Sequence, residues 1–155
     1  AGGGIQTDTG ALTYGGIIAG TGSLRKTGTG TLALSGATTY AGGTNVSGGL
    51  LQLSADATLG SGALTLDGGG IQFGAAFNDL RIFTLGTNGA TLDTNSFNVT
   101  YAPVISGGGT LTKNGAGTLT LTGANSLPGG VTVTAGTLAV SSGALRAATS
   151  LGLVD

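Results

Sequence analysis

The 155-residue chain contains no cysteine, histidine, methionine, tryptophan or glutamate. Without cysteine and histidine it lacks the usual zinc ligands, a thiol nucleophile and an imidazole general base. Charged residues make up 7% of the chain and the net charge is -1, with the five basic residues scattered. Nucleic-acid binding is not expected, because it requires clustered positive charge. No apolar run approaches the ~20 residues of a membrane-spanning helix, so membrane insertion of this segment is not expected either.

The abundant residues indicate a folded chain of unusual composition. Glycine contributes 34 residues, hydrophobic residues make up 39%, and the mean hydropathy is +0.38. Disordered chains show the reverse, few hydrophobic residues and much charge. Glycine does not recur at every third position, which excludes collagen. We expect one domain over residues 1–155.

Apolar and polar residues alternate in many short segments. The clearest are residues 31–35, 51–53, 64–66, 111–113, 118–122 and 131–133. A period of two buries one face of a β-strand and exposes the other. Helical periodicity is weak everywhere, and its best candidate is residues 142–151. The pattern predicts an all-β protein made of short strands.

The sequence also repeats itself. A shift of 87 positions aligns the two halves without a gap, placing Lys26 on Lys113 and Gly49 on Gly136. Further aligned pairs are Tyr14 and Tyr101, Leu24 and Leu111, Gly28 and Gly115, Leu32 and Leu119, Gly36 and Gly123, and Val46 and Val133. The copies span about 1–68 and 88–155, with the best-matching motifs at 22–53 and 109–140. Recurrent glycines mark sharp corners, because glycine adopts positive φ without a Cβ penalty.

Short strands between regularly placed corners predict a parallel β-solenoid. Each coil is expected to add three short strands, and each strand to pair with its equivalent one coil below. Coils of roughly 20–25 residues give about seven coils, each rising ~4.8 Å. Inward Leu, Val and Ile should stack in columns, while outward Thr and Ser face water.

Several side chains receive specific predictions. Lys26 and Lys113 are placed outside the core, as solvated charges that hinder lateral strand pairing. Pro103 and Pro128 are placed at corners, where they remove no ladder hydrogen bond. Residues 80–85 alternate and are a candidate apolar outer face. The aromatic residues are expected to fill columns, stack or cover corners: Tyr14, Tyr40, Phe73, Phe77, Phe83, Phe97 and Tyr101.

Residues 22–53 resemble the passenger-associated transport repeat of bacterial autotransporters. The resemblance rests on Gly-x-Leu-x-Lys-x-Gly-x-Gly-Thr-Leu-x-Leu-x-Gly, followed by Tyr-x-Gly-Gly-Thr-x-Val and Gly-x-Leu. Residues 109–140 repeat the pattern, with Leu127, Pro128 and Val131 as departures. The first copy has Thr38 where the family usually has asparagine, whereas the second keeps Asn125.

This resemblance implies a secreted or cell-surface protein of a Gram-negative-type bacterium, linked to the outer membrane. In that family the repeat forms part of a right-handed parallel β-helix and is thought to assist outward transport by folding outside the cell. The absence of cysteine is compatible with such a route, because disulfides cannot cross-link the chain during passage.

Catalytic, metal and cofactor sites are not expected. Asp56 and Asp67, like Asp79 and Asp93, are close in sequence, but no periodicity brings either pair into a cleft as glycoside hydrolysis requires. We interpret these aspartates as corner and cap residues. Residues 3–8 lack the third glycine of the calcium-binding nonapeptide repeat. The glycine clusters at 2–4, 68–70 and 107–109 lack the lysine and hydroxyl residue of a phosphate loop.

Three functions remain open at this point. The favoured one is a non-catalytic, rigid stalk that supports export and adhesion, with host or surface ligands as partners. The alternative is an extracellular fibre subunit that associates with itself, end to end through open solenoid edges or laterally. A polysaccharide-active enzyme on the same scaffold is the third.

Overall fold

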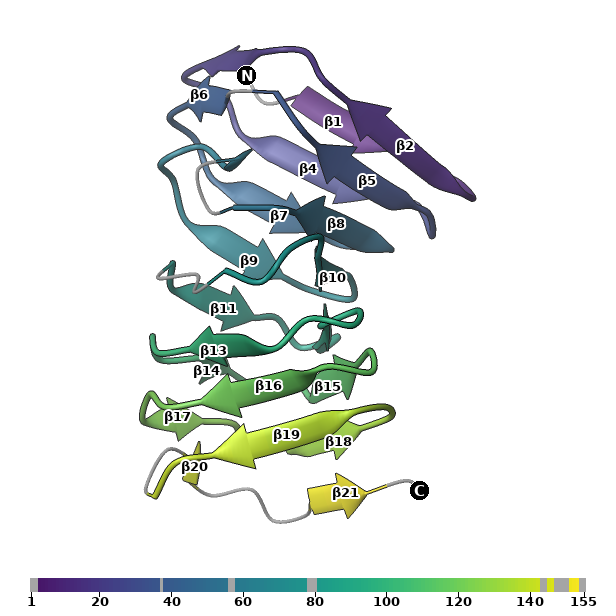
Figure 1. The fold of residues 1–155 in the computed structure, drawn as a ribbon. Helices are drawn as coiled ribbons and strands as arrows, with labels where there is room; N and C mark the ends of the chain where they lie inside the picture. Colours follow the sequence, from purple (N-terminus) through teal and green to yellow (C-terminus); the bar gives the residue numbers. More distant parts are fainter. Residues whose placement is uncertain are drawn as a thin grey trace.

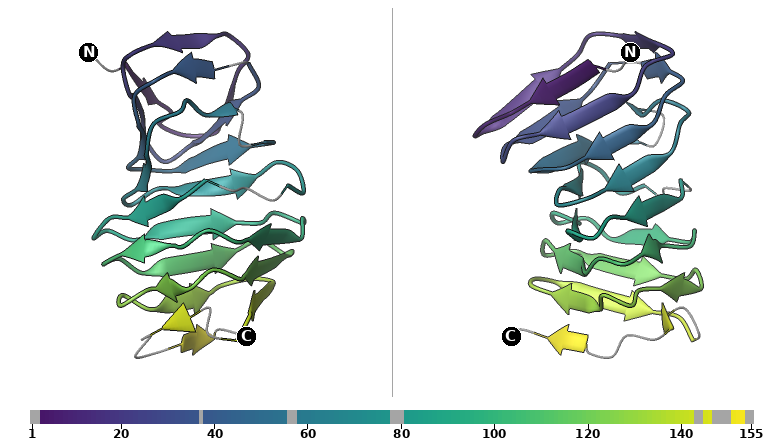
Figure 2. Two further views of the ribbon diagram at one scale, coloured as in Figure 1. Left: turned by 90° about the vertical axis from the view of Figure 1, so that its left-hand side faces the viewer. Right: turned by 180° about the vertical axis from the view of Figure 1, so that it is seen from behind.

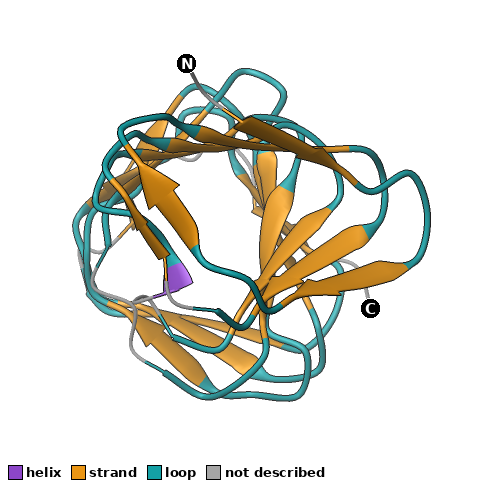
Figure 3. Cartoon of the chain, turned by 90° about the horizontal axis from the view of Figure 1, so that it is seen from above, coloured by secondary structure: helices purple, strands orange, loops and turns teal. Residues whose placement is uncertain are grey.

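A computed structural model describes residues 3–36, 38–55, 58–77, 81–142, 145–146 and 151–153. These residues form a rod of stacked coils, with β1 and β2 at one end and β21 at the other (Figure 1). Views from two further sides show the same stacking (Figure 2). Apart from a short helical turn at Thr58, the described residues form strands, bends and turns (Figure 3).

The strands lie on three faces around a central core, as the view along the axis shows (Figure 3). Face 1 contains β1 (Gly3–Gln6), β4 (Leu24–Thr27), β7 (Thr44–Val46), β9 (Leu64–Leu66), β11 (Phe83–Leu85) and β14 (Ser106–Gly107), continued by β17 (Asn125–Ser126) and β20 (Leu145–Arg146). Face 2 contains β2 (Ala11–Tyr14), β5 (Thr31–Leu34), β8 (Leu50–Leu53), β10 (Gly70–Phe73), β12 (Ala90–Asp93), β15 (Leu111–Asn114), β18 (Val131–Val133) and β21 (Leu151–Leu153). Face 3 contains β3 (Ile18–Gly20) and β6 (Thr38–Tyr40), then β13 (Val99–Tyr101), β16 (Thr118–Leu121) and β19 (Thr137–Val140).

Every strand pair is parallel, and the partners lie one coil apart. Leu119 pairs with Leu138 and Thr84 with Ser106, so that one coil contains about 20 residues. Face 2 is a continuous sheet of eight strands, which corresponds to about seven coils. The parallel β-solenoid with about three strands per coil is therefore confirmed.

The core consists of inward side chains stacked along the axis. On face 2, Leu32, Leu51, Ile71 and Leu92 follow one another in register, and all four are buried. The residues between them in each strand point outward, so the alternation of residues 31–35, 51–53 and 64–66 is confirmed. Each inward residue rests on the same position of the next coil, and the resulting columns on the three faces together form the core of the rod.

The aromatic residues mostly fill these columns. Tyr40, Phe73, Phe83 and Tyr101 are buried, and the ring of Phe83 packs against that of Tyr101 in a tilted arrangement with centroids 5.1 Å apart. Phe77 and Phe97 pack against the core from partly buried positions, and Tyr14 is exposed at the N-terminal coil. Pro103 and Pro128 lie between strands, as expected.

Two expectations need correction or completion. The weak helical candidate at residues 142–151 contains strand β20 instead, while residues 143–144 and 147–150 lie outside the described part of the chain. Residues 81–85 alternate as expected, but the prediction of an apolar outer face is wrong, because Phe83 and Leu85 lie in the core and Ile82, 64% exposed, stands beside the polar, exposed Thr84. Leu80 lies outside the described residues.

The 87-residue repeat is not a whole number of coils. The first strand of the best-matching motif is β4 on face 1 in the first copy, whereas it is β15 on face 2 in the second copy. Four coils of about 20 residues account for about 80 of the 87 residues, and the remainder is about the length of one strand and one corner. The second motif is therefore rotated about the axis by one face relative to the first. The motif can start on either face, because all faces of the coil consist of short strands joined by similar glycine corners.

Candidate functional site

The aspartates do not form a cluster of ligands or catalytic groups within the described part of the chain. Asp67 accepts hydrogen bonds from the backbone and side-chain nitrogens of Asn88, at 2.9 and 3.0 Å, and so caps a corner. Asp93 accepts a hydrogen bond from the Asn95 backbone at 2.8 Å. Asp56 and Asp79 lie outside the described residues. Among the described residues no group of three acidic, cysteine or histidine side chains is placed to hold a metal ion.

The prediction that Lys26 is a solvated edge charge is wrong. Its side chain is fully buried in the face 1 column, between Ile5 and Val46. The ammonium group donates hydrogen bonds to the carbonyl oxygens of Thr27 at 2.9 Å, Gly28 at 3.1 Å and Gly48 at 2.9 Å. Burial of a charge is tolerated here because all three N–H groups have acceptors.

Lys113 repeats this arrangement on face 2, and its predicted exposure is also wrong. It is fully buried in the column between Leu92 and Val133. Its ammonium donates to the carbonyl oxygens of Asn114 at 2.8 Å, Gly115 at 2.8 Å and Ala135 at 3.1 Å. These acceptors are the 87-residue equivalents of Thr27, Gly28 and Gly48.

We call these two groups of carbonyl oxygens the lysine corners. In each, two acceptors belong to the lysine's own corner and the third to the corner of the next coil, so the ammonium joins neighbouring coils. The alternating pattern by itself would have placed both lysines inward, because Leu24 and Leu111 lie two residues before them and are buried. The prediction instead followed the general preference of lysine for solvent, although the long apolar stem of a lysine can lie in an apolar column.

The two corners differ in their electrostatic surroundings. Burial lowers the pKa of both lysines below the ordinary 10.5, because a charged group loses hydration in the interior. At Lys113 the nearby carboxylate of Asp93 opposes that lowering of the pKa. The position equivalent to Asp93 in the first copy is the neutral Gln6, since each pairs with the residue after its lysine.

The copies also differ at one polar position of the motif. Asn125 is fully buried, accepts the backbone N–H of Ile105 at 2.7 Å and donates to the Gly123 carbonyl at 2.9 Å. Its equivalent Thr38 has a buried hydroxyl without a hydrogen-bond partner among the described residues. Threonine is too short to repeat the bond between coils that the asparagine makes.

A ladder of polar side chains follows the outer surface of face 2. Gln52 donates to Gln72 at 2.9 Å, and Gln72 donates to Asp93 at 3.2 Å. Asn114 donates to Asp93 at 3.4 Å and accepts from the Thr134 hydroxyl at 3.2 Å. These residues come from successive coils, so the ladder links coils through side chains as well as backbone.

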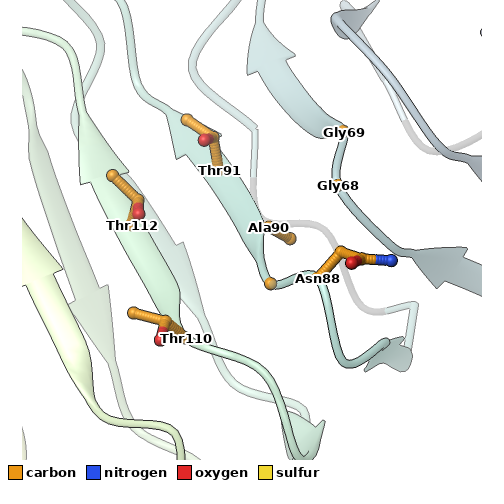
Figure 4. Close-up of a pocket in the computed structure, with 8 residues that line it drawn as sticks. Gly68, Gly69, Asn88, Ala90, Thr91, Thr110 and Thr112 are labelled. Carbon is orange, nitrogen blue, oxygen red and sulfur yellow. The ribbon is translucent and has the colours of Figure 1, made fainter.

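Beside this ladder lies a small polar hollow of about 130 Å³. The residues that line it include Gly68, Gly69, Asn88, Thr91, Thr110 and Thr112 (Figure 4). Thr91 and Thr112 are register partners, so their side chains stand side by side on one face (Figure 4). The described residues that line the hollow include no charged or aromatic side chain, and its chemistry is limited to neutral hydrogen bonding.

The first described strands, β1 and β2, have a described neighbour on one side only. Leu12 and Tyr14 are 45% and 39% exposed, although their partners Leu32 and Leu34 in the next coil are buried. Ile17 is also exposed at the same end. A coil is buried on both sides only where it has two neighbours, and the described residues provide β1 and β2 with one.

The fold and these corners define a class: a parallel β-solenoid whose coils are joined by glycine turns and buried lysines. A family model described as the passenger-associated transport repeat matches residues 24–53 and 111–140. These matches run from the start of β4 to the end of β8 and from the start of β15 to the end of β19, and each contains one lysine corner. The resemblance of these two segments to autotransporter passenger repeats is confirmed.

The two matched segments together make up less than half of the chain. Neither the curated proteins nor the solved structures gave a significant match. Within the described residues no helix has the length and apolarity needed to cross a membrane.

Proposed function

We propose that the chain is a non-catalytic, rigid β-helical stalk of a secreted or cell-surface protein, where it supports export and holds an adhesive surface away from the cell. The observation that carries this proposal is that both family matches coincide with complete runs of strands, β4 to β8 and β15 to β19, in one continuous solenoid. The matched family is associated with autotransporter passengers, which supports a location outside the cell.

Coil-by-coil assembly supports the role in export. Each strand pairs with the same face of an adjacent coil, as β16 does with β19 and β11 with β14. A coil that has crossed a pore can therefore fold on the coil already formed, without waiting for distant segments. Each folded coil then hinders backward movement, which favours outward transport without an external energy source.

An export assay tests this role. The substitutions Gly49→Ala and Gly136→Ala are introduced together into the full-length protein in its own host, because they are expected to disturb both lysine corners. We expect a several-fold loss of surface-exposed protein, measured by protease accessibility on intact cells, because loss of stability lowers the folded population outside.

Gly108→Ala is the matched control, because the space around Gly108 is open and its φ is not positive. It should leave surface exposure unchanged. Normal export of the double variant, together with measured destabilisation of the same chain in solution, would refute coil folding as a support for export.

A further inference from the structure

We propose that each lysine corner is a binding site for a primary ammonium ion, which the native chain fills with its own lysine. The site consists of three backbone carbonyl oxygens that converge on one buried point, at 2.8 to 3.1 Å from the nitrogen. An ammonium group carries three N–H donors, so the number of donors and acceptors matches.

In each corner one acceptor, the carbonyl of Thr27 or of Asn114, also accepts a backbone N–H of the neighbouring coil and is held independently of the lysine side chain. The Thr27 carbonyl also accepts the Thr7 N–H of the neighbouring coil, at 3.1 Å. The carbonyls of Lys26 and Lys113 accept the backbone N–H groups of Ser47 and Thr134, both at 2.9 Å, and so fix the next coil against the corner. Shortening the lysine should therefore leave the carbonyl oxygens of Thr27 and Asn114 where they are.

Glycine at the adjacent position keeps room for the cation. A Cβ atom on Gly49 would lie 2.8 Å from the Lys26 nitrogen and 2.7 Å from the Gly28 oxygen. A Cβ atom on the equivalent Gly136 would lie 2.3 Å from the Gly115 carbonyl oxygen and 2.5 Å from that of Gly117. The second copy repeats the acceptors and this clearance on another face, so the site is a property of the motif.

The chemistry of the site selects its ligand. Three neutral carbonyl oxygens suit a monovalent cation with N–H donors, and the apolar column beneath suits a short alkyl chain. In a Lys→Ala variant, n-propylammonium reproduces the missing Cγ, Cδ, Cε and Nζ atoms. The corner vacated by Lys113→Ala should bind it more tightly than that vacated by Lys26→Ala, because Asp93 lies near the former.

Thermal unfolding of Lys26→Ala and Lys113→Ala tests the site. Each variant is compared in n-propylammonium chloride and in tetramethylammonium chloride at equal concentration, since the second ion has the same charge but no N–H donor. A ligand that binds only the folded state, at about ten times its Kd, raises the melting temperature by about 3–6 °C. We expect such a rise in both variants, larger for Lys113→Ala, and none in the unsubstituted protein.

Equal melting temperatures in the two salts for both variants would overturn the proposal. If neither variant folds, the unsubstituted protein still decides, because Lys26 and Lys113 are its two lysines. With ¹⁵N-labelled lysine, both ammonium groups should give resolved N–H signals at neutral pH, where exchange with water removes those of exposed lysines. Absence of both signals would show that the corners do not hold the cation.

Discussion

Replacing Gly49 with alanine is expected to destabilise the solenoid by about 2–5 kcal/mol, the sum of a left-handed backbone penalty and overpacking. Gly49 has a φ of 59°, and a Cβ atom there would lie 2.2 Å from the Gly30 carbonyl oxygen. That oxygen belongs to backbone that pairs with the next coil, so it cannot move away without loss of the ladder. Gly136→Ala should behave alike, because its φ is 69° and the Gly115 oxygen lies 2.3 Å from the added atom.

Urea and thermal unfolding followed by circular dichroism measure this effect, with an expected fall in melting temperature of about 4–20 °C. Hydrogen exchange should locate it: Gly49→Ala exposes the amides of β5 and β8, and Gly136→Ala those of β16 and β19. Each coil of a solenoid contacts only its neighbouring coils, so the loss of amide protection should stay close to the substituted corner. Gly108→Ala should remain within about 0.5 kcal/mol of the unsubstituted protein. Equal stability of Gly49→Ala and Gly108→Ala would contradict the corner geometry.

Replacing Lys113 with methionine is expected to cost about 2–4 kcal/mol, because three carbonyl oxygens lose a charged donor. Relief of the desolvation of the ammonium offsets part of this cost. Lys26→Met should have a smaller effect, since Asp93 adds a favourable charge at Lys113 and the neutral Gln6 takes its place at Lys26. Methionine keeps the length of the apolar stem, so the loss, measured by urea unfolding, reports the missing ammonium.

Arg25→Met is the matched control for the lysine variants. Arg25 precedes Lys26 in β4 but points outward, where its side chain donates to the Ser47 hydroxyl at 3.3 Å. Loss of an exposed contact of this kind should change the free energy of unfolding by less than about 0.5 kcal/mol. Lysine variants that prove as stable as Arg25→Met would mean that desolvation cancels the hydrogen bonds at the corners.

Much of the architecture followed from the sequence. Alternation in segments such as residues 31–35 determined which side chains point inward, because a strand has a period of two. The glycines shared by the two copies, Gly49 and Gly136 among them, determined where the chain turns. Together with the resemblance over residues 22–53 and 109–140, these patterns were sufficient for the parallel solenoid and its approximate number of coils.

The positions of the two lysines were decided only by the tertiary structure. The acceptors that make burial of Lys26 possible include Gly48, which is distant in sequence and meets the ammonium only when the next coil is stacked. Sequence reasoning assigns lysine to solvent, since the carbonyl oxygens of a corner are invisible until their directions are known. The placement of the second motif one face further around the axis was also decided only by the tertiary structure. The strand pairing defines the length of a coil, and the 87-residue repeat is not a whole multiple of that length.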